Sequence, residues 1–308
     1  MIIQPKKNDF QFLNLLLENI IPAFCIVFVN FARVISYTLI MNYFRDKVVA
    51  VTGGSEGIGR ALVEQLLQMG CKVSTCARNG DKLYQLQLLH PHQTLHTVVA
   101  DVSRENDCRQ FIQSTLKEFG GIDILINNAG VSMRGLFNET TVETIHHLMN
   151  VNFWGALYCT KHALPSILDR RGDVVGVSSI AGYRGLPGRS GYSASKYALQ
   201  GWLEALRTEM MHTGVNVMWV CPGFTMSNIR FAALNSEGKP HGDTSMEEGK
   251  MMSTDECAAN ILKAIAKRKR TLVMTFQGKF TVWTNRLFGG LADYWVHKFF
   301  FKDGKLVK

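Results

Sequence analysis

Thr52-Gly53-Gly54-Ser55-Glu56-Gly57-Ile58-Gly59 is a glycine-rich turn of the pattern T-G-x-x-x-G-x-G. Residues 48–51, a β-branched apolar run, precede it and are typical of a strand buried on both faces. Residues 60–67 follow with the spacing of a helix. Glycines let the backbone approach a pyrophosphate, which then rests on amides at the helix N-terminus. The order strand, glycine turn, helix therefore predicts a dinucleotide-binding unit.

Outward from this turn, apolar strand-like segments alternate with helical ones. Further strands are expected at residues 72–77, 95–100, 122–126, 174–177, 215–220 and 271–274. The intervals between them leave room for helical crossovers, so we expect one doubly wound (Rossmann) α/β domain with a mostly parallel seven-stranded sheet. Ligands of such sheets bind beyond the carboxyl ends of the strands. Five motif positions fall at such ends: Gly53, Asp101, Asn127, Ser179 and Pro222.

A tyrosine and a lysine downstream indicate acid–base chemistry. Tyr192 and Lys196 are four residues apart, and Ser179 lies thirteen residues before the tyrosine. Positions i and i+4 of a helix share one face, so the phenol and the ammonium would enter the same site. A free tyrosine has a pKa of about 10, and a neighbouring cation favours the phenolate and lowers that pKa. The pair therefore predicts a proton donor and acceptor that works near neutral pH.

Together these motifs resemble the short-chain dehydrogenase/reductase family over roughly residues 46–270. They stand in that family's order: residues 52–59, Asn127-Asn128-Ala129-Gly130, Ser179, Tyr192 with Lys196, and Pro222-Gly223. Within the family, the chain is similar to the membrane-associated branch that acts on steroids and long-chain lipids. The resemblance implies an oxidoreductase that uses NAD(H) or NADP(H).

The resemblance also implies roles for individual residues. Tyr192 would give a proton to the carbonyl oxygen in reduction and take it back in oxidation, and Ser179 would hydrogen-bond the same oxygen. Lys196 would hold the ribose hydroxyls and stabilise the phenolate. Asn152 matches the asparagine that holds a water linking Lys196 to solvent; Asn150 is its rival by spacing, and a residue that only caps or kinks its helix is the alternative. The expected cofactor contacts are Gly53, Ser55, Gly57, Ile58, Gly59, Asp101, Val102, Asn128, Ala129, Gly130, Tyr192, Lys196, Pro222, Gly223 and Thr225.

The end of the second strand bears on the choice of cofactor. An acidic residue there accepts hydrogen bonds from a ribose 2′-hydroxyl, whereas a basic residue neutralises a 2′-phosphate. The chain has Ala77 and Arg78 at this point, which favours NADP(H) over NAD(H), with Ser55 as a second phosphate contact. A solvated loop arginine is the alternative. Glu56 departs from the basic residue that many NADP(H)-dependent relatives carry in the glycine turn.

Composition limits the classes of partner. Residues 267–308 hold ten Lys or Arg against two Asp, out of a net charge of +9 for the chain. Because the remainder is near neutral, nucleic-acid binding is not expected, and the basic tail points to an acidic partner or an anionic membrane surface. Residues 280–302 mix aromatics with lysines, which suits a membrane interface, a homodimer contact or a cover over the substrate mouth. The resemblance implies a homo-oligomer.

The cysteines indicate neither disulfides nor zinc. They are scattered singly, without a C-x-x-C pair, at positions 25, 71, 76, 108, 159, 221 and 257. We therefore expect no metal site and a reducing, cytoplasmic compartment for the catalytic domain.

Residues 12–44 are the most hydrophobic stretch, although Asn30 and Arg33 interrupt it. A membrane anchor or re-entrant helix is the favoured interpretation, and an amphipathic helix on a membrane or partner is the second. In a third, Met41 is the true start and the protein is cytoplasmic. The expected division is residues 1–45 as a hydrophobic extension, 46–270 as the catalytic domain, and 271–308 as the last strand with a basic, aromatic tail.

These observations predict NADPH-dependent reduction of a ketone, or the reverse alcohol oxidation, on a bulky apolar lipid- or steroid-like substrate. Residues 226–252 interrupt the strand–helix rhythm and are interpreted as a substrate lid, with core packing beneath a lid as the alternative for its apolar residues. Two other functions stay open. One is reduction of 3-oxoacyl thioesters in fatty-acid synthesis, and the other is a non-catalytic dinucleotide sensor or scaffold.

Overall fold

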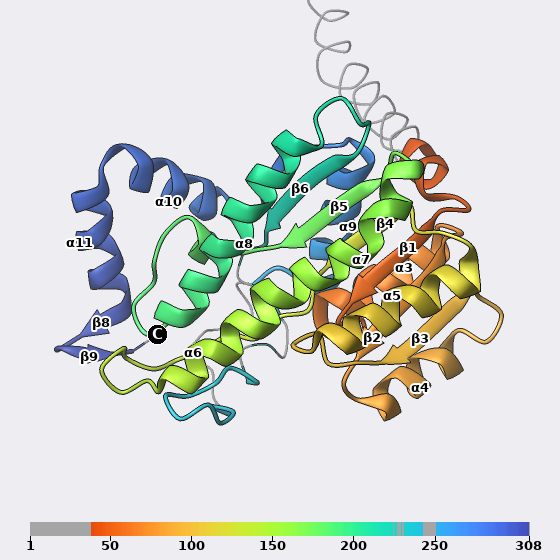
Figure 1. Cartoon of the computed structure of the whole chain (residues 1–308). Helices are drawn as coiled ribbons and strands as arrows, with labels where there is room; N and C mark the ends of the chain where they lie inside the picture. Colours follow the sequence, from red (N-terminus) through yellow and green to blue (C-terminus); the bar gives the residue numbers. More distant parts are fainter. Residues whose placement is uncertain (1–37, 224, 227–228, 230, 243–250, 308) are drawn as a thin grey trace, which may run out of the picture. The chain divides into compact units, whose positions relative to one another are not determined.

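Seven parallel strands form the central sheet, in the order β3-β2-β1-β4-β5-β6-β7 (Figure 1). They are β1 (Val48–Thr52), β2 (Lys72–Ala77), β3 (Leu95–Val99), β4 (Ile124–Asn127), β5 (Asp173–Val177), β6 (Asn216–Cys221) and β7 (Thr271–Val273). β1, β4 and β5 are buried along their whole length, as expected of central strands covered on both faces. The predicted doubly wound fold is confirmed, and every ladder of this sheet is parallel.

The computed structural model describes residues 38–223, 225–226, 229, 231–242 and 251–307. Phe44–Lys308 is one unit, and everything below concerns it; Met1–Tyr43 is the other. Among the described residues, no helix is both long and apolar enough to cross a bilayer. The expected membrane segment, residues 12–44, lies outside the described residues except for its last seven.

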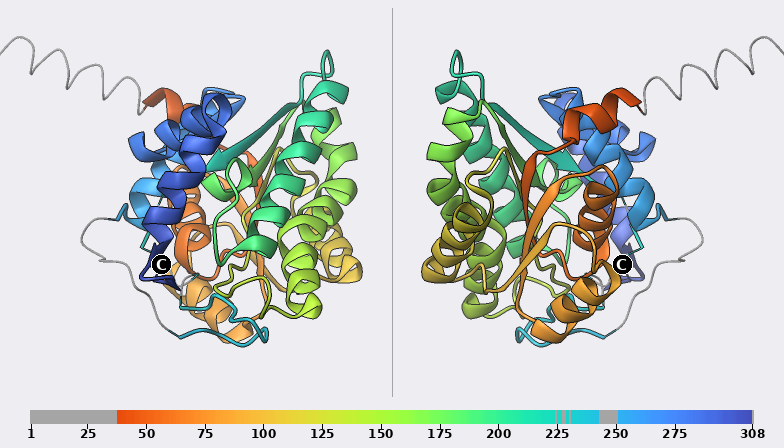
Figure 2. Two further views of the ribbon diagram at one scale, coloured as in Figure 1. Left: turned by 90° about the vertical axis from the view of Figure 1, so that its left-hand side faces the viewer. Right: turned by 90° about the vertical axis from the view of Figure 1, so that its right-hand side faces the viewer.

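Two layers of helices cover the sheet (Figure 2). On one face are α5 (Glu105–Phe119), α6 (Val142–Met149), α7 (Gly155–Asp169) and α8 (Ser190–Glu209). On the other are α3 (Gly57–Gln68), α4 (Gly80–Leu89) and α9 (Thr254–Ala266). α5 packs on α7, and α3 packs on α9. The sequence sets the ends of α5, because Glu105 and Asp107 lie in its first turn and Gly120 ends it with φ 73°.

The main apolar core lies between the sheet and the α5–α7–α8 layer. Phe111, Ile112, Leu125, Leu199 and Leu203 belong to it and are fully or almost fully buried. Strand order reverses beside β1, where β2 pairs on one side and β4 on the other. The loops after β1 and β4 therefore diverge at their carboxyl ends and open a crevice there. This is the edge at which the sequence places its motifs.

The C-terminal residues form helices, which the sequence analysis did not assign. α10 (Phe276–Leu287) and α11 (Gly289–Phe300) follow β7 and lead into a small antiparallel pair, β8 (Phe301–Lys302) and β9 (Lys305–Leu306). Thr275 caps α10 by accepting a hydrogen bond from the backbone N–H of Gly278. The C-terminal residues are therefore ordered structure that packs on the body of the protein.

All cysteines among the described residues are buried and free, and Cys25 lies outside them. Within the described part of the chain, no cluster of His, Cys, Asp or Glu has the composition of a metal site.

Candidate active site

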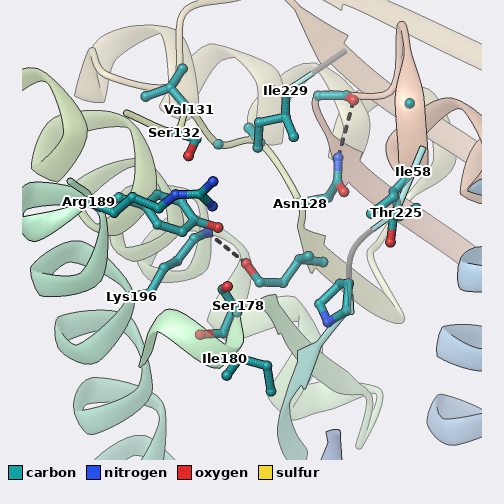
Figure 3. A pocket seen from close by; sticks show the side chains of 18 of the residues that line it. Ile58, Asn128, Val131, Ser132, Ser178, Ile180, Arg189, Lys196, Thr225 and Ile229 are labelled. Carbon is teal, nitrogen blue, oxygen red and sulfur yellow. Dashed lines mark hydrogen bonds between the residues drawn. The ribbon is translucent and has the colours of Figure 1, made fainter. Parts of the chain in front are cut away.

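A cavity of about 1020 Å³ opens at the carboxyl ends of the strands. It extends from the glycine turn after β1 to the start of α8 (Figure 3). Residues of α10 and α11 also contribute to its wall. Most of the residues expected at the site line it: Gly53, Ser55, Gly57, Ile58, Gly59, Arg78, Asp101, Val102, Asn128, Ala129, Gly130, Ser179, Tyr192, Lys196, Pro222, Gly223 and Thr225. The motifs are thus distant in sequence and adjacent in space.

The glycine turn is shaped so that only glycine fits at its key positions. Gly53 has φ 72° and Gly57 has φ 58°, a region that favours glycine. A Cβ on Gly59 would lie 2.1 Å from the carbonyl oxygen of Gly53. No side chain caps the first turn of α3. The amides there are oriented to receive an anion such as a pyrophosphate, so the turn fits the dinucleotide that the sequence predicts.

Asn128 holds the glycine turn in place. Its side-chain amide donates to the carbonyl oxygens of Thr52, at 2.9 Å, and Gly53, at 3.2 Å. In return, the Thr52 hydroxyl accepts from the backbone N–H groups of Asn128 and Ala129, both at 3.0 Å. Asn128 therefore lines the cavity while its amide group fixes the loop after β1 to the loop after β4.

Basic residues gather where β2 ends. Arg78 and Lys82 line the cavity here beside the neutral Asn79, and Lys82 Nζ forms an ion pair of 2.5 Å with Glu56 of the glycine turn. Lys82 was not expected at the site, although its position four residues after Arg78, at the start of α4, could have indicated it.

Asp101 is a carboxylate that also lines the cavity near the end of β2, where the charge of Arg78 acts on it. Burial opposes its ionisation, but the backbone and side chain of Ser103 hydrogen-bond to it, and Arg78 and Arg104 add positive charge. The pKa of the Asp101 carboxyl is therefore held below its ordinary value.

Tyr192 and Lys196 lie on one face of α8 and are almost fully buried. Lys196 Nζ lies 5.8 Å from the centre of the Tyr192 ring and donates to the carbonyl oxygen of Val177 at 2.9 Å (Figure 3). The Ser179 side chain is a polar neighbour of Tyr192 and favours the ionised form of its phenol. The Ser178 hydroxyl instead accepts from Gln200 at 2.8 Å. The tyrosine, lysine and Ser179 therefore meet at one point of the cavity wall.

The electrostatics of this group differ from the sequence-based expectation. Burial raises the pKa of the Tyr192 phenol, although the side chain of Ser179 and the charge of Arg189 act in the opposite direction. Burial also lowers the pKa of Lys196 to about 8. We expected the ammonium to lower the phenol's pKa, but desolvation of both groups is the larger effect.

Asn152 lies in a π-helical turn, Asn150–Trp154, between α6 and α7. Its amide accepts from the Val131 N–H at 2.8 Å and donates to the Val131 carbonyl and the Ser195 hydroxyl, both at 2.9 Å. A Cβ on Gly130 would lie 3.1 Å from Asn152 Oδ1 and 3.5 Å from Lys196 Nζ. Asn152 is therefore next to Lys196 but behind the cavity wall, where it joins the loop after β4 to α8.

Aromatic residues of α10 and α11 form a wall that the sequence analysis did not assign residue by residue. The lining residues from these helices include Phe280, Trp295, Val296, Phe299 and Phe300. The rings of Phe280 and Trp295 stack with their centres 5.7 Å apart. The aromatic–basic tail was left with three interpretations, and the structure shows that part of it lines the cavity.

Arg184 fastens the two C-terminal helices to the body. It donates to Asn285 of α10 at 3.0 Å and pairs with Asp293 of α11. Asn285 also donates to the Tyr183 carbonyl at 2.8 Å. α10 additionally packs on the short 3-10 turn Ile180–Gly182, where a Cβ on Gly278 would lie 2.9 Å from Ile180.

The segment expected to form a lid lies partly outside the described residues. Of its described part, Ile229 and Ala232 line the cavity. Leu234 bridges to Met133, and the Met226 N–H donates to the Met252 carbonyl at 2.9 Å. The described part thus contributes to one side of the cavity.

The family assignment rests on these features and on sequence. Residues 47–237 match the family model described as short chain dehydrogenase. The chain belongs to the short-chain dehydrogenase/reductase family and is an NAD(P)-dependent oxidoreductase. Its cofactor is a nicotinamide dinucleotide.

Among curated proteins, the chain is similar to a dehydrogenase/reductase SDR family protein 7-like of Anopheles gambiae, with 35% identity over 76% of each chain. It is also similar to dehydrogenase/reductase SDR family member 7B of Mus musculus, with 33% identity over 81% of this chain and 80% of the mouse protein.

Solved structures agree on the fold. A short-chain dehydrogenase from Streptomyces avermitilis has a TM-score of 0.71 and 29% identity, over 82% of this chain and 97% of its own. A short chain dehydrogenase/reductase from Burkholderia phymatum in complex with NAD has a TM-score of 0.70 and 22% identity, over 80% of this chain and 95% of its own.

Proposed function

We propose that the protein is an NADPH-dependent reductase of a ketone on a bulky apolar substrate, able also to oxidise the corresponding alcohol. One observation supports this above the others. A single cavity joins the basic end of β2 and the glycine turn to Tyr192, Ser179 and Lys196, and then to an aromatic wall. A dinucleotide and an apolar carbonyl compound would both fit along this path.

The proposed chemistry assigns one task to each residue. Tyr192 gives its phenolic proton to the carbonyl oxygen, and Ser179, a polar neighbour of Tyr192, orients the same oxygen. Lys196 holds positive charge near the developing phenolate. The nicotinamide dinucleotide, when bound, supplies the hydride.

Residues of the wall support the reacting groups. Gly130 keeps the space beside Lys196 open, and Asn152 fixes the backbone at Val131. Asn152 is thus proposed as a positioning residue. The contacts of Asn152 are compatible with both roles that the sequence left open. In one role the asparagine holds a water that links Lys196 to solvent, and in the other it only caps or kinks its helix.

We propose a preference for NADPH over NADH because positively charged side chains line the cavity at the end of β2. β2 ends in Ala77 and is followed by Arg78, so no carboxylate stands at this strand end to accept bonds from a ribose 2′-hydroxyl. Arg78 and Lys82 line the cavity there together with Ser55. The pair that Lys82 forms with Glu56 also offsets the acidic residue in the glycine turn, because the carboxylate already has a cation beside it.

We propose an apolar substrate because aromatic side chains of α10 and α11 line the cavity. Phe280, Trp295, Phe299 and Phe300 present aromatic surface to the cavity, with Ile180 and Leu186 nearby on the body. Aromatic surface of this kind favours a lipid- or steroid-like skeleton over a small polar ketone.

Contact of the outer face of α10 and α11 with a membrane surface is also proposed. Trp283, Phe288 and Tyr294 are each more than half exposed, and Arg286 and Lys298 lie on the same two helices. Aromatics among basic side chains suit an anionic headgroup region. We propose that the catalytic unit lies on the cytoplasmic side of such a membrane, and a homo-oligomer that covers the same face is the alternative. Co-sedimentation with anionic and neutral vesicles and the mass in solution distinguish the two.

The central test is oxidation of NADPH in the presence of a panel of ketones that increase in apolar size. The wild-type protein should consume NADPH with bulky ketones, and Tyr192→Phe should lose this activity while it binds NADPH as before. A Lys117→Met variant, changed on the far end of α5, serves as the control. Tight NADPH binding with no turnover of any ketone would refute the proposal and favour a sensor.

A further inference from the structure

The loop between β5 and α8, residues 178–189, carries a residue of the reacting group and also anchors the aromatic wall. Ser179 lies at its start, and Arg184 lies further along it. The loop is held to α8 because the Tyr197 hydroxyl donates to the Tyr183 carbonyl. Asn285 of α10 donates to the same carbonyl oxygen at 2.8 Å. The position of α10 is therefore tied to the loop of the catalytic serine and to α8, the helix of the acid–base pair.

Arg184 joins both helices of the wall to this loop. Its guanidinium donates to Asn285 of α10 at 3.0 Å and pairs with Asp293 of α11. The arginine is mostly buried, whereas the aspartate is exposed, so the pair reaches from the body to the outside of α11. Trp295 and Phe280 line the cavity and stack on each other, yet they are 43% and 42% exposed. Because these two rings are only partly enclosed, their own packing constrains their position less than a buried core would.

Apolar contacts also join the C-terminal part to the loop, but they do not have the same directionality. A Cβ on Gly278 of α10 would lie 2.9 Å from Ile180, and a Cβ on Gly188 would lie 2.5 Å from Leu306 of β9. Apolar attraction has no preferred direction, so it holds surfaces together without fixing how they are aligned. A guanidinium has N–H groups in a rigid plane, which aligns the groups that it binds. Arg184 is therefore well suited to set the alignment of α10 and α11 over the cavity.

We propose that Arg184 is a specificity-determining positioning residue, which aligns the aromatic wall with the catalytic loop and so favours bulky apolar substrates. This inference rests on the proposed ketone reductase function. Arg184, Asn285 and Asp293 are absent from the described residues that line the cavity, so they would act on the substrate through the wall. A bulky apolar skeleton reaches the wall and depends on its alignment. A small ketone reacts at Tyr192 without reaching the wall and does not.

The test compares KM and kcat for a small ketone and for a steroid-sized apolar ketone. Arg184→Met should raise KM for the bulky ketone about 5- to 10-fold, as expected for the loss of one ion pair and one hydrogen bond. It should change kcat, KM for the small ketone and KM for NADPH much less. Asp293→Ala should act in the same direction. The double variant should be no worse than Arg184→Met, because both substitutions break the same link between the loop and α11.

Conservative variants and a control on another helix separate this role from a general loss of structure. Arg184→Lys keeps the charge and loses the paired N–H groups, so it should retain part of the preference for the bulky ketone, and Asp293→Glu should retain most of it. Asp293 is exposed, so Asp293→Ala tests the link even where Arg184→Met fails to fold. Arg109→Met removes an exposed arginine of α5 that bonds to Asn106, and it should change KM for neither ketone.

Two measurements do not depend on turnover. Hydrogen exchange of the backbone amides of α10 and α11 should be faster in Arg184→Met and Asp293→Ala than in the wild type, while the amides of the central sheet exchange as before. Binding of the bulky ketone, followed by tryptophan fluorescence in the Tyr192→Phe background, should weaken by the same factor when Arg184→Met is added.

The outcomes are distinct. Equal changes in KM for the two ketones, a loss of kcat shared by both, or unchanged hydrogen exchange of α11 in both variants would overturn the inference and leave ketone reduction standing. Faster exchange of α11 and weaker binding of the bulky ketone, without turnover of any ketone by the wild type, would support the role of Arg184 and refute the reductase function.

Discussion

Replacing Lys196 with methionine should make the folded protein more stable while it removes activity. Lys196 is 3% exposed, and burial lowers its pKa from 10.5 to about 8. That difference means that the charged ammonium costs about 3 kcal/mol of folding free energy near pH 7. Methionine has a similar length and no charge. The substitution also removes the hydrogen bond from Lys196 to the Val177 carbonyl, which costs about 1 kcal/mol. We therefore expect the free energy of unfolding to rise by the difference, about 2 kcal/mol.

The pH dependence gives the sign of the effect. Because the folded pKa of Lys196 is below the unfolded one, the unfolded chain binds more protons at this residue between about pH 8 and 10.5. The destabilisation of the wild type by the buried ammonium therefore disappears as the pH rises through this window. The higher free energy of unfolding of Lys196→Met should shrink, or fall below that of the wild type, by about pH 10. The buried thiols, such as Cys76 with its pKa raised to about 12, are present in both proteins and largely cancel in the comparison.

Urea unfolding followed by tryptophan fluorescence at pH 7 and pH 10 measures this difference. Tyr192→Phe is the matched control, since it should also remove activity but carries away no charge at pH 7. A Lys196→Met variant that is less stable than the wild type at pH 7, or a difference that does not change with pH, would show that the ammonium is not destabilised by burial.

Three further changes have defined outcomes. Arg78→Ala should raise KM for NADPH about 10- to 100-fold and leave KM for NADH nearly unchanged in steady-state assays, because it removes a charge-assisted contact to the 2′-phosphate; equal effects on both would contradict this. Asn152→Ala should lower the free energy of unfolding by about 2 kcal/mol in urea, since it strands the buried Val131 N–H and its carbonyl partner; an unchanged midpoint would contradict it. Trp295→Ala should raise KM for a bulky apolar ketone but not for a small one, and a uniform effect on both would argue against an aromatic substrate wall.

The sheet could be predicted closely because its signals are local. The expected strand at residues 48–51 is β1, Val48–Thr52, and the expected strand at residues 72–77 is β2 to the residue. Buried parallel strands give continuous β-branched runs, and the glycines of the turn have no substitute where φ is positive. Once the strands are parallel, their carboxyl ends share one edge, so the meeting of the motifs follows from topology.

Features that depend on long-range packing could not be predicted in this way. The sequence shows an ammonium and a phenol on one helix face, but the direction of the Tyr192 pKa depends on how deeply the helix buries them. Arg184 gives no local sign that it will pair with Asp293, more than a hundred residues later. Asn152, in its π-helical turn, likewise bonds to Val131 and Ser195, which lie 21 and 43 residues away in the sequence.

The distribution of charge along the cavity connects the proposals. Arg78 and Lys82 line the nucleotide end of the cavity, and Lys196 and Arg189 line the Tyr192 end. The whole cavity has a volume of about 1020 Å³. Cations confined in a partly apolar cavity repel each other less when anions lie between them, because the low dielectric strengthens every pairing. A phosphorylated dinucleotide supplies negative charge at the first pair and along the glycine turn. The charge of Arg189 also acts at the Tyr192 end, where it favours the ionised form of the phenol against the opposing effect of burial.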